Sequence, residues 1–262
     1  MIDNAFEMRF LLRLQDPSYE MNRLLILTIA AYIGSVSSVY ARSFISHRGL
    51  NLDCTVAGEN SLEAIELAKR AGFDCIEMDV RTTADDSLIV MHDATLNRTC
   101  IMTDGSDIRH QTAIDTISFA TLRKRYVVRA DADSMRTAVP TLREYLMECR
   151  RNRLLPFIEP KLYDPTGRHY CRIIAIADDI LGRGKYIITS NNRANDIIRR
   201  TLGVADIPLM GILYQTTFEN ISSLGNVIMA VSASRFDEHA FSQNVARSHI
   251  TGLLTESHAD TY

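Results

Sequence analysis

The sequence predicts an α/β fold in which strands and helices alternate along a parallel sheet. Short apolar segments recur through the 262 residues, and most are followed by a longer segment with helical periodicity. Strands that alternate with helices at this spacing form parallel sheets, because each helix returns the chain to the starting edge of the sheet. A content of 46% hydrophobic and 23% charged residues is that of a globular domain, which excludes a disordered or fibrous protein.

The first predicted elements are a short strand and a helix. Residues 43–46 are prone to form a strand, which ends at the sequence His47-Arg48-Gly49. Asn60 is the expected N-cap of the helix, and Glu63, three residues later, completes a start that resembles a capping box. Apolar residues at helical spacing then continue to Gly72, which we expect to end the helix.

A pair of strands and a long irregular segment come next. Residues 75–80 and 88–93 are predicted strands joined by a turn at 85–87. Residues 94–139 are polar and weakly periodic, so we interpret them as an excursion from the main sheet. The alternation then resumes, with helices expected at 142–152, 168–181, 194–202 and 237–248, and strands at 156–162, 186–190, 208–214, 227–232 and 252–255.

The first 41 residues are expected to lie outside the folded domain, which we assign to residues 42–262. Residues 24–41 carry no formal charge, begin with an apolar core and end in small residues, as a secretory signal peptide does. The alternative is a membrane-spanning helix, but serines interrupt the second half of the segment. Because the pattern starts at Met21, we expect translation to start there. The protein would then be exported to the periplasm or outside the cell, with no stable membrane span after cleavage.

Charge and cysteine content exclude several function classes. The net charge is −3 and the sequence has no basic run, so it offers no surface for nucleic acid. The five cysteines form no Cys-x-x-Cys pair, which excludes a zinc finger and a redox dithiol.

Two carboxylates share one face of the strand predicted at 75–80. Residues two apart on a strand point to the same side, so Glu77 and Asp79 point one way and their apolar neighbours the other. Inside a parallel sheet the two charges would repel each other and lose solvation, and a hard divalent cation removes both penalties. The alternative is an antiparallel strand whose polar face lies in water.

Further polar residues fall at the ends of neighbouring strands. Glu159 and Lys161 share one face of the strand predicted at 156–162, and His47 and His92 each follow an apolar strand. The carboxyl ends of parallel strands meet at one edge of the sheet, where such folds place their active sites. A third carboxylate beside the first two gives a cation site made only of oxygens, and Lys161 adds a positive charge for an anionic substrate.

These segments resemble the glycerophosphodiester phosphodiesterase family. The resemblance is carried by His47-Arg48-Gly49, Glu59-Asn60-Ser61, Glu77-Met78-Asp79, the stretch from His92 to Thr99, and Glu159-Pro160-Lys161. The order and spacing are highly specific from residue 46 to 99 and extend to 161. Beyond 165 only the alternation of strands and helices is similar.

The resemblance implies a TIM (β/α)₈-type barrel. It also implies an enzyme that hydrolyses glycerophosphodiesters, which are small molecules, to glycerol 3-phosphate and an alcohol. The implied cofactor is one divalent cation, Ca²⁺ or Mg²⁺, bound by Glu77, Asp79 and Glu159.

The other site residues follow position by position from the resemblance. His47 and His92 would be the general acid and base, in an order that the sequence leaves open. Imidazole has an unperturbed pKa of about 6.5, so a pair of histidines can exchange these tasks at neutral pH. Arg48 and Lys161 would hold the phosphate, and Glu59 would lie in the layer behind them.

The chain departs from the family pattern at two places. Pro160 stands where an aliphatic residue is usual, and it lacks an N–H for the strand ladder. We count seven barrel strands, with 88–93 as the hairpin partner of 75–80, and expect the barrel to lack its last strand-helix unit. The alternatives to an active hydrolase are a truncated or non-catalytic barrel that serves as a binding module, and a related phosphodiesterase of the phospholipase C or D type.

Overall fold

The computed structural model describes residues 45–49, 56–131, 135–189, 192–212, 227–232 and 250–256. The chain divides into two units, Met1–Ser43 and Phe44–Tyr262, and all described residues belong to the second unit. The expected signal segment and the helix expected at 237–248 therefore lie outside the described residues. In the described part of the chain, no helix has both the length and the apolar character needed to cross a membrane.

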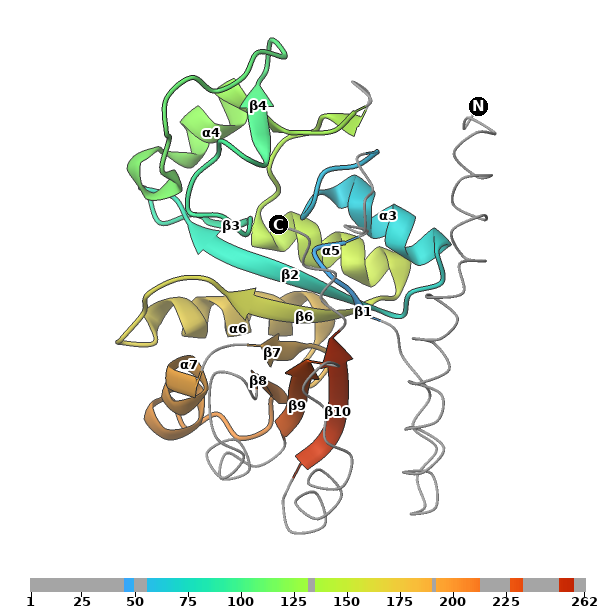
Figure 1. The fold of residues 1–262 in the computed structure, drawn as a ribbon. Helices are drawn as coiled ribbons and strands as arrows, with labels where there is room; N and C mark the ends of the chain where they lie inside the picture. Colours follow the sequence, from blue (N-terminus) through green and yellow to red (C-terminus); the bar gives the residue numbers. More distant parts are fainter. Residues whose placement is uncertain are drawn as a thin grey trace. The chain divides into compact units, whose positions relative to one another are not determined.

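The main element of the fold is a parallel sheet (Figure 1). Its strands are β1 (Ile45–Ser46), β2 (Cys75–Thr82), β6 (Leu155–Pro160), β7 (Ile187–Thr189), β8 (Leu209–Ile212), β9 (Val227–Ser232) and β10 (Ile250–Glu256). Every neighbouring pair is parallel, and the order of strands in the sheet follows their order in the chain. This arrangement confirms the predicted α/β class, and the described residues contain the seven parallel strands that were counted from the sequence. Within those residues, β1 pairs with β2 and β10 with β9, and no pairing joins β10 to β1.

An antiparallel hairpin extends the sheet at β2. β3 (Leu88–Val90) runs back along the end of β2, which confirms the predicted hairpin, although the strand ends before His92. The backward course brings the chain level with the middle of β2, where the Met91 N–H donates to the Asp79 carbonyl oxygen at 2.9 Å. His92 therefore reaches the same region of β2 as Asp79, although it follows an antiparallel strand.

Three helices pack against one face of β2 and β6. They are α3 (Leu62–Arg70), α5 (Leu142–Asn152) and α6 (Arg168–Leu181). One apolar core contains side chains from these helices together with Ile76, Met78 and Val80, which alternate along β2 with the two acidic residues. The alternation predicted for this strand is confirmed. Glu77 and Asp79 therefore lie on the opposite face of the sheet, which we call the acidic face.

The ends of the helices follow their capping residues. The bounds of α5 and α6 agree with the prediction, and α5 begins with a capping box between Thr141 and Glu144. The prediction for α3 is wrong by one residue, because its N-cap is Ser61, whose hydroxyl accepts from the Ala64 N–H at 3.1 Å. Asn60 instead adopts a left-handed conformation with φ of 59° and turns its side chain toward the acidic strand.

The last described helical segment also differs from the prediction. One α-helix was expected at 194–202, whereas the chain forms α7 (Asn192–Asp196) and continues as a π-helical segment, η3 (Ile197–Thr201). Ile197 and Ile198 are buried at the start of η3, so the wider turn still places apolar side chains against the main core.

Residues 94–139 contain a small core of their own. β4 (Cys100–Met102) and β5 (Tyr126–Val128) form a separate antiparallel pair, accompanied by the 3₁₀-helix η1 (Ile114–Thr116) and α4 (Phe119–Arg125). Figure 1 draws this segment in green, with α4 and β4 labelled. Its buried side chains form a cluster with residues at the end of β3: Ile89, Met91, Leu96, Cys100, Ile114, Leu122, Tyr126, Val128 and Val139. Residues 94–139 therefore form a compact unit, although their sequence shows only weak periodicity.

Pro160 is accommodated within the parallel ladder. It lies opposite Val80 at the end of β6, and the next residue, Lys161, donates its N–H to the Val80 carbonyl oxygen at 2.9 Å. The ladder to β2 thus needs no N–H from Pro160, and Glu159 keeps its regular place opposite Asp79.

Candidate active site

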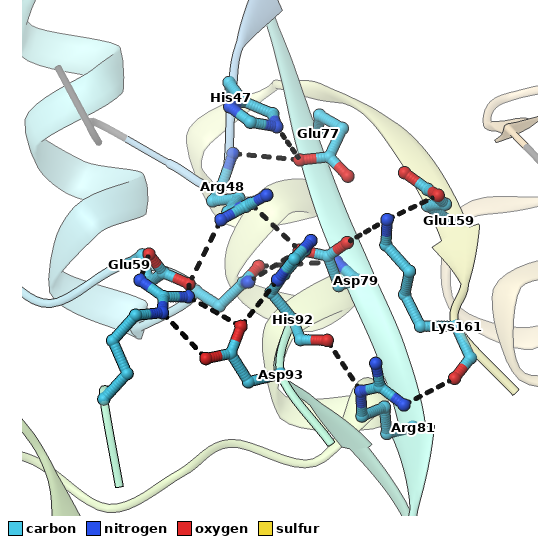
Figure 2. Close-up of polar contacts among 12 residues, drawn as sticks. His47, Arg48, Glu59, Glu77, Asp79, Arg81, His92, Asp93, Glu159 and Lys161 are labelled. Carbon is cyan, nitrogen blue, oxygen red and sulfur yellow. Dashed lines mark hydrogen bonds and ion pairs between the residues drawn. The ribbon is translucent and has the colours of Figure 1, made fainter. Parts of the chain in front are cut away.

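Three carboxylates meet on the acidic face of β2 and β6. The parallel register places Asp79 directly opposite Glu159, and Glu77 precedes Asp79 by two residues on the same face. One carboxylate oxygen from each of the three residues lies within 4.8 Å of the others. Glu77 and Asp79 are buried, with 6% and 1% of their surface exposed. The structure therefore brings together the three acidic residues selected from the sequence (Figure 2).

The cluster is electrostatically unfavourable on its own. Burial raises the pKa of Glu77 well above its usual value, and the charges of Asp79 and Glu159 raise it further. Burial also raises the pKa of Glu159, although the ammonium group of Lys161 opposes this shift. Each carboxylate thus makes ionisation of the other two less favourable, and a positive charge among them would compensate for this repulsion.

The oxygen atoms of the cluster fit a hard divalent cation. Glu77 Oε2 accepts from the Arg48 backbone N–H at 3.0 Å, and Asp79 Oδ2 accepts from Asn60 Nδ2 at 2.9 Å. The second oxygens, Glu77 Oε1 and Asp79 Oδ1, are buried and have no hydrogen-bond partner among the described residues. Buried oxygens normally have a partner, and several carboxylate oxygens without one are the ligands that Ca²⁺ and Mg²⁺ prefer.

A tight turn after β1 places His47 beside the carboxylates. Arg48 and Gly49 both have positive φ values, 54° and 81°, and the Ser46 hydroxyl donates to the Gly49 carbonyl oxygen at 2.5 Å. A Cβ atom at Gly49 would lie 2.6 Å from the Ala64 Cβ, so the close approach to α3 requires glycine. In this geometry His47 Nε2 lies 3.9 Å from Glu77 Oε2.

Two cationic side chains flank the cluster. Arg48 reaches Asp79 Oδ2 with Nε and Glu59 Oε1 with Nη1, each at 3.5 Å. Lys161 Nζ lies 2.7 Å from Glu159 Oε1 and 3.7 Å from Asp79 Oδ1. Burial alone would lower the pKa of the Lys161 ammonium, but the Glu159 and Asp79 charges outweigh burial and raise it. Lys161 therefore remains protonated at neutral pH.

His92 belongs to a second polar group next to the carboxylates. Its Nδ1 lies 2.7 Å from Asp93 Oδ1, and Glu59, His92 and Asp93 offer ligand atoms within 4.8 Å of one another. These groups already have a positive charge among them, because the Arg98 guanidinium hydrogen-bonds to both Glu59 and Asp93. Glu59 therefore contacts both Arg48 and Arg98, and Arg48 links it to Asp79 (Figure 2).

Asn60 and Arg81 also belong to the site, although the sequence assigned neither of them a role there. Asn60 holds Asp79 through its Nδ2 and also accepts from the Asp79 N–H with Oδ1 at 3.4 Å. Arg81 joins two loops by donating to the carbonyl oxygens of His92 at 2.6 Å and Lys161 at 2.8 Å. Arg81 follows Glu77 and Asp79 at the same strand spacing, so the period of two could have identified it. The side-chain contacts of Asn60 span 19 residues and leave no local signal.

Comparison with known proteins identifies the family to which this chain belongs. The model of the glycerophosphoryl diester phosphodiesterase family matches residues 47–248, which include all eight site residues selected from the sequence. The chain belongs to this family. The family is generally dependent on a divalent metal ion, in agreement with the acidic cluster.

Curated relatives of the family match the chain over part of their length. Glycerophosphodiester phosphodiesterase 1 of Bos taurus is 35% identical over 122 residues, which are 45% of this chain and 34% of the relative. The Mus musculus protein of the same name is 34% identical over 119 residues, again 45% of this chain and 34% of the relative. The chain thus matches about a third of the length of these curated relatives.

Solved structures of the family share the fold. A glycerophosphoryl diester phosphodiesterase, named as putative, from Silicibacter pomeroyi superposes with a TM-score of 0.66 at 18% identity, and the match covers 84% of each chain. A phosphodiesterase from Oleispira antarctica, solved in complex with the product sn-glycerol-3-phosphate, gives 0.65 at 20% identity and covers 84% of this chain and 86% of that one. The chain accordingly has a TIM-barrel-like α/β fold.

Proposed function

We propose that this protein hydrolyses glycerophosphodiesters to glycerol 3-phosphate and an alcohol. The observation that carries the proposal is the cluster of Glu77, Asp79 and Glu159, flanked by His47 and by two cationic side chains. Family membership and the names of the curated relatives support the same reaction. So does the glycerol 3-phosphate held by the Oleispira antarctica protein.

Glu77, Asp79 and Glu159 would hold one divalent cation, which we propose to be Ca²⁺ or Mg²⁺. The donors are all carboxylate oxygens, and two of them, Glu77 Oε1 and Asp79 Oδ1, have no hydrogen-bond partner within the described residues. When bound, such an ion withdraws charge from a phosphoryl oxygen and so lowers the barrier to displacement at phosphorus.

Arg48 and Lys161 would bind the phosphodiester anion beside the carboxylates. Both side chains are already drawn toward Asp79, Arg48 at 3.5 Å and Lys161 at 3.7 Å, so their charges converge on one region. Charge that accumulates on phosphoryl oxygens during the reaction is stabilised by fixed cations of this kind.

His47 and His92 would transfer the protons. The leaving alcohol must receive a proton and the attacking oxygen must lose one, and a pair of imidazoles can perform both steps near neutral pH. The His47 side chain is 43% exposed and that of His92 is 28% exposed, so a small substrate can reach both rings.

The test is release of glycerol 3-phosphate from glycerophosphocholine. Wild-type protein should release it, a chelator should abolish release, and added Ca²⁺ or Mg²⁺ should restore it. His47→Ala and Glu159→Gln should each lower kcat by at least about 100-fold. His110→Ala, at an exposed histidine outside the site, is the matched control and should retain full activity. Release that survives chelation or the loss of His47 would contradict the mechanism. Metal binding without any release would favour the non-catalytic binding module.

We also propose that the protein is exported. The support is the sequence of residues 21–41, with its apolar core and small residues before position 42. Sequencing of the exported protein should find an N-terminus at position 42. An exported chain that retains residues 1–20 would contradict the translation start at Met21, and a chain found only in the cytoplasm would contradict export.

A further inference from the structure

We infer that Asp93 and Arg98 are positioning residues that fix the tautomer of His92 and keep its Nε2 available as a proton acceptor. The inference rests on the proposed function, which makes His92 one of the two proton-transfer groups. Neither residue has a role in the site as selected from the sequence, although both lie in the stretch from His92 to Thr99 that resembles the family.

The contacts form a chain from the imidazole to a guanidinium fork. Asp93 Oδ1 lies 2.7 Å from His92 Nδ1, and Arg98 donates to both Asp93 oxygens, from Nε to Oδ2 at 2.7 Å and from Nη2 to Oδ1 at 2.8 Å. The same guanidinium donates to both oxygens of Glu59, at 2.7 and 2.8 Å. Two bidentate contacts on one planar group leave it little freedom to rotate.

The charge state of Asp93 decides which imidazole nitrogen carries the proton. The hydrogen bonds from Arg98 hold the pKa of the Asp93 carboxyl far below its usual value, so Asp93 is ionised at neutral pH. An ionised carboxylate only accepts hydrogen bonds, so the neutral His92 ring must carry its proton on Nδ1. Nε2 then has a free lone pair, which is the state that a general base requires.

The backbone around Arg98 is fixed by the small core of residues 94–139. Leu96 and Cys100, two residues to either side, are fully buried, and the Cys100 N–H donates to the Leu96 carbonyl oxygen at 2.8 Å. Asn97 also anchors the turn, because its side chain donates to the carbonyl oxygens of Ile108 and His110. The segment that leaves the main sheet thereby supplies a rigid support for His92.

The same fork connects the two polar groups of the site. Glu59 Oε1 accepts from Arg98 at 2.7 Å and lies 3.5 Å from Arg48 Nη1. Gly58 permits this placement, since a Cβ there would lie 2.2 Å from Val128 Cγ1 in β5. Arg98 therefore helps to place Arg48 through Glu59 and His92 through Asp93. The second of these links can be tested directly, because it determines the tautomer of His92.

Asp93→Leu should release the tautomer of His92 while keeping the branched shape of the side chain. Asp93 Oδ1 accepts from Arg98 Nη2 and contacts His92 Nδ1, and Oδ2 accepts from Arg98 Nε. A leucine offers no acceptor, so the proton on His92 Nδ1 loses its partner and the ring can carry the proton on Nε2 instead. In a serine protease, replacing the carboxylate beside the catalytic histidine lowers kcat by about 10⁴-fold through the wrong tautomer.

The experiment is a nitrogen-15 NMR measurement of the His92 ring in the chain labelled at histidine, at pH 8, with signals assigned by their loss in His92→Gln. Wild-type protein should show the tautomer with the proton on Nδ1, whereas Asp93→Leu should show a substantial population with the proton on Nε2. The kcat of Asp93→Leu on glycerophosphocholine should fall by at least about 100-fold, with KM changed by less than about threefold. Arg98→Met should lower kcat by about tenfold or more, and Arg98→Lys should recover only part of the loss, because a lysine has no planar fork.

The matched control is Arg183→Met. Arg183 also bridges two carboxylates, Asp178 and Asp206, with a side chain 44% exposed against 52% for Arg98, and it contacts none of the site residues selected from the sequence. It should leave kcat and the His92 spectrum unchanged. A His92 ring that stays fully protonated on Nδ1 in Asp93→Leu, or an unchanged kcat in that variant, would overturn the inference. If wild-type protein released no glycerol 3-phosphate, the proposed function would fail, while the NMR measurement would still decide whether Asp93 sets the tautomer.

Discussion

Replacement of Glu77 by Gln should stabilise the metal-free protein and remove its stabilisation by metal. Glu77 is 6% exposed, and its carboxylate has oxygens of Asp79 and Glu159 within 4.8 Å. The Gln oxygen can keep the hydrogen bond from the Arg48 N–H, and its amide nitrogen takes the place of Oε1, which has no partner within the described residues. The variant thus removes a buried negative charge and supplies a donor among carboxylates.

The expected magnitude follows from the spacing. Two unit charges 4.8 Å apart repel by about 3–4 kcal/mol at an effective dielectric constant of about 20. Lys161, 2.7 Å from Glu159, offsets part of this repulsion, and protonation of Glu77 limits the remainder. We therefore expect Glu77→Gln to raise the free energy of unfolding in chelator by about 1–2 kcal/mol, or roughly 2–8 °C in melting temperature.

The pH dependence has a definite sign. The pKa of Glu77 is raised in the folded protein, so ionisation of this group opposes folding at neutral pH and has no effect below its unfolded pKa of about 4. The advantage of Gln should therefore be largest at pH 7–8 and disappear near pH 4.

The assay is thermal unfolding at pH 7.5 with chelator and with excess Ca²⁺ or Mg²⁺. Metal at 100 times its Kd should stabilise wild-type protein by about 2.7 kcal/mol and Glu77→Gln by much less, so the order of the two melting temperatures reverses. Glu66→Gln, at a partly exposed position on α3, is the control and should change neither value by more than about 0.5 kcal/mol. A Glu77→Gln protein that is less stable than wild type in chelator, or that keeps the full metal shift, would refute this reasoning.

Three further predictions concern the scaffold, each measured by urea unfolding. Tyr145→Phe should raise the free energy of unfolding by about 1 kcal/mol, because the Tyr145 hydroxyl is buried without a hydrogen-bond partner among the described residues; a loss of stability would contradict this. Thr141→Ala should lower it by about 1 kcal/mol, because the capping box with Glu144 is lost, and an unchanged midpoint would show that the cap contributes nothing. Asp178→Asn should lower stability by less than about 1 kcal/mol at pH 7, because the side chain is partly exposed. Hydrogen bonds from Arg183 lower the pKa of Asp178, so its contribution is present above about pH 4 and lost as the pH falls further; equal losses at pH 7 and pH 2 would contradict the assignment.

The elements that could be predicted from the sequence are those set by local signals. Thr141 and Glu144 mark the start of α5, Gly182 marks the end of α6, and the observed bounds of both helices agree with the prediction. The acidic face of β2 also follows from a local rule, since residues two apart share a side. Together with the likeness of the motifs to a known family, these signals were sufficient to select the three carboxylates.

The contacts that the sequence does not reveal join residues far apart in the chain. Asn60 gives up the N-cap position expected for it and binds Asp79, 19 residues away, because its left-handed backbone turns the side chain away from α3. Arg98 reaches Glu59 across 39 residues. The hairpin that carries His92 was predicted from the turn at 85–87, but its register, which sets His92 level with Asp79, was not. None of these placements has a short-range pattern, because each depends on how separate segments pack.

The most direct test of the account is the number of divalent cations that the chain binds. Equilibrium dialysis of wild-type protein against Ca²⁺ and against Mg²⁺ should give one ion per chain, and Asp79→Asn should lose that ion while its circular dichroism spectrum is unchanged. A stoichiometry of zero for wild type with both ions, or an Asp79→Asn protein that binds as tightly as wild type, would contradict the claim that these three carboxylates form a metal centre.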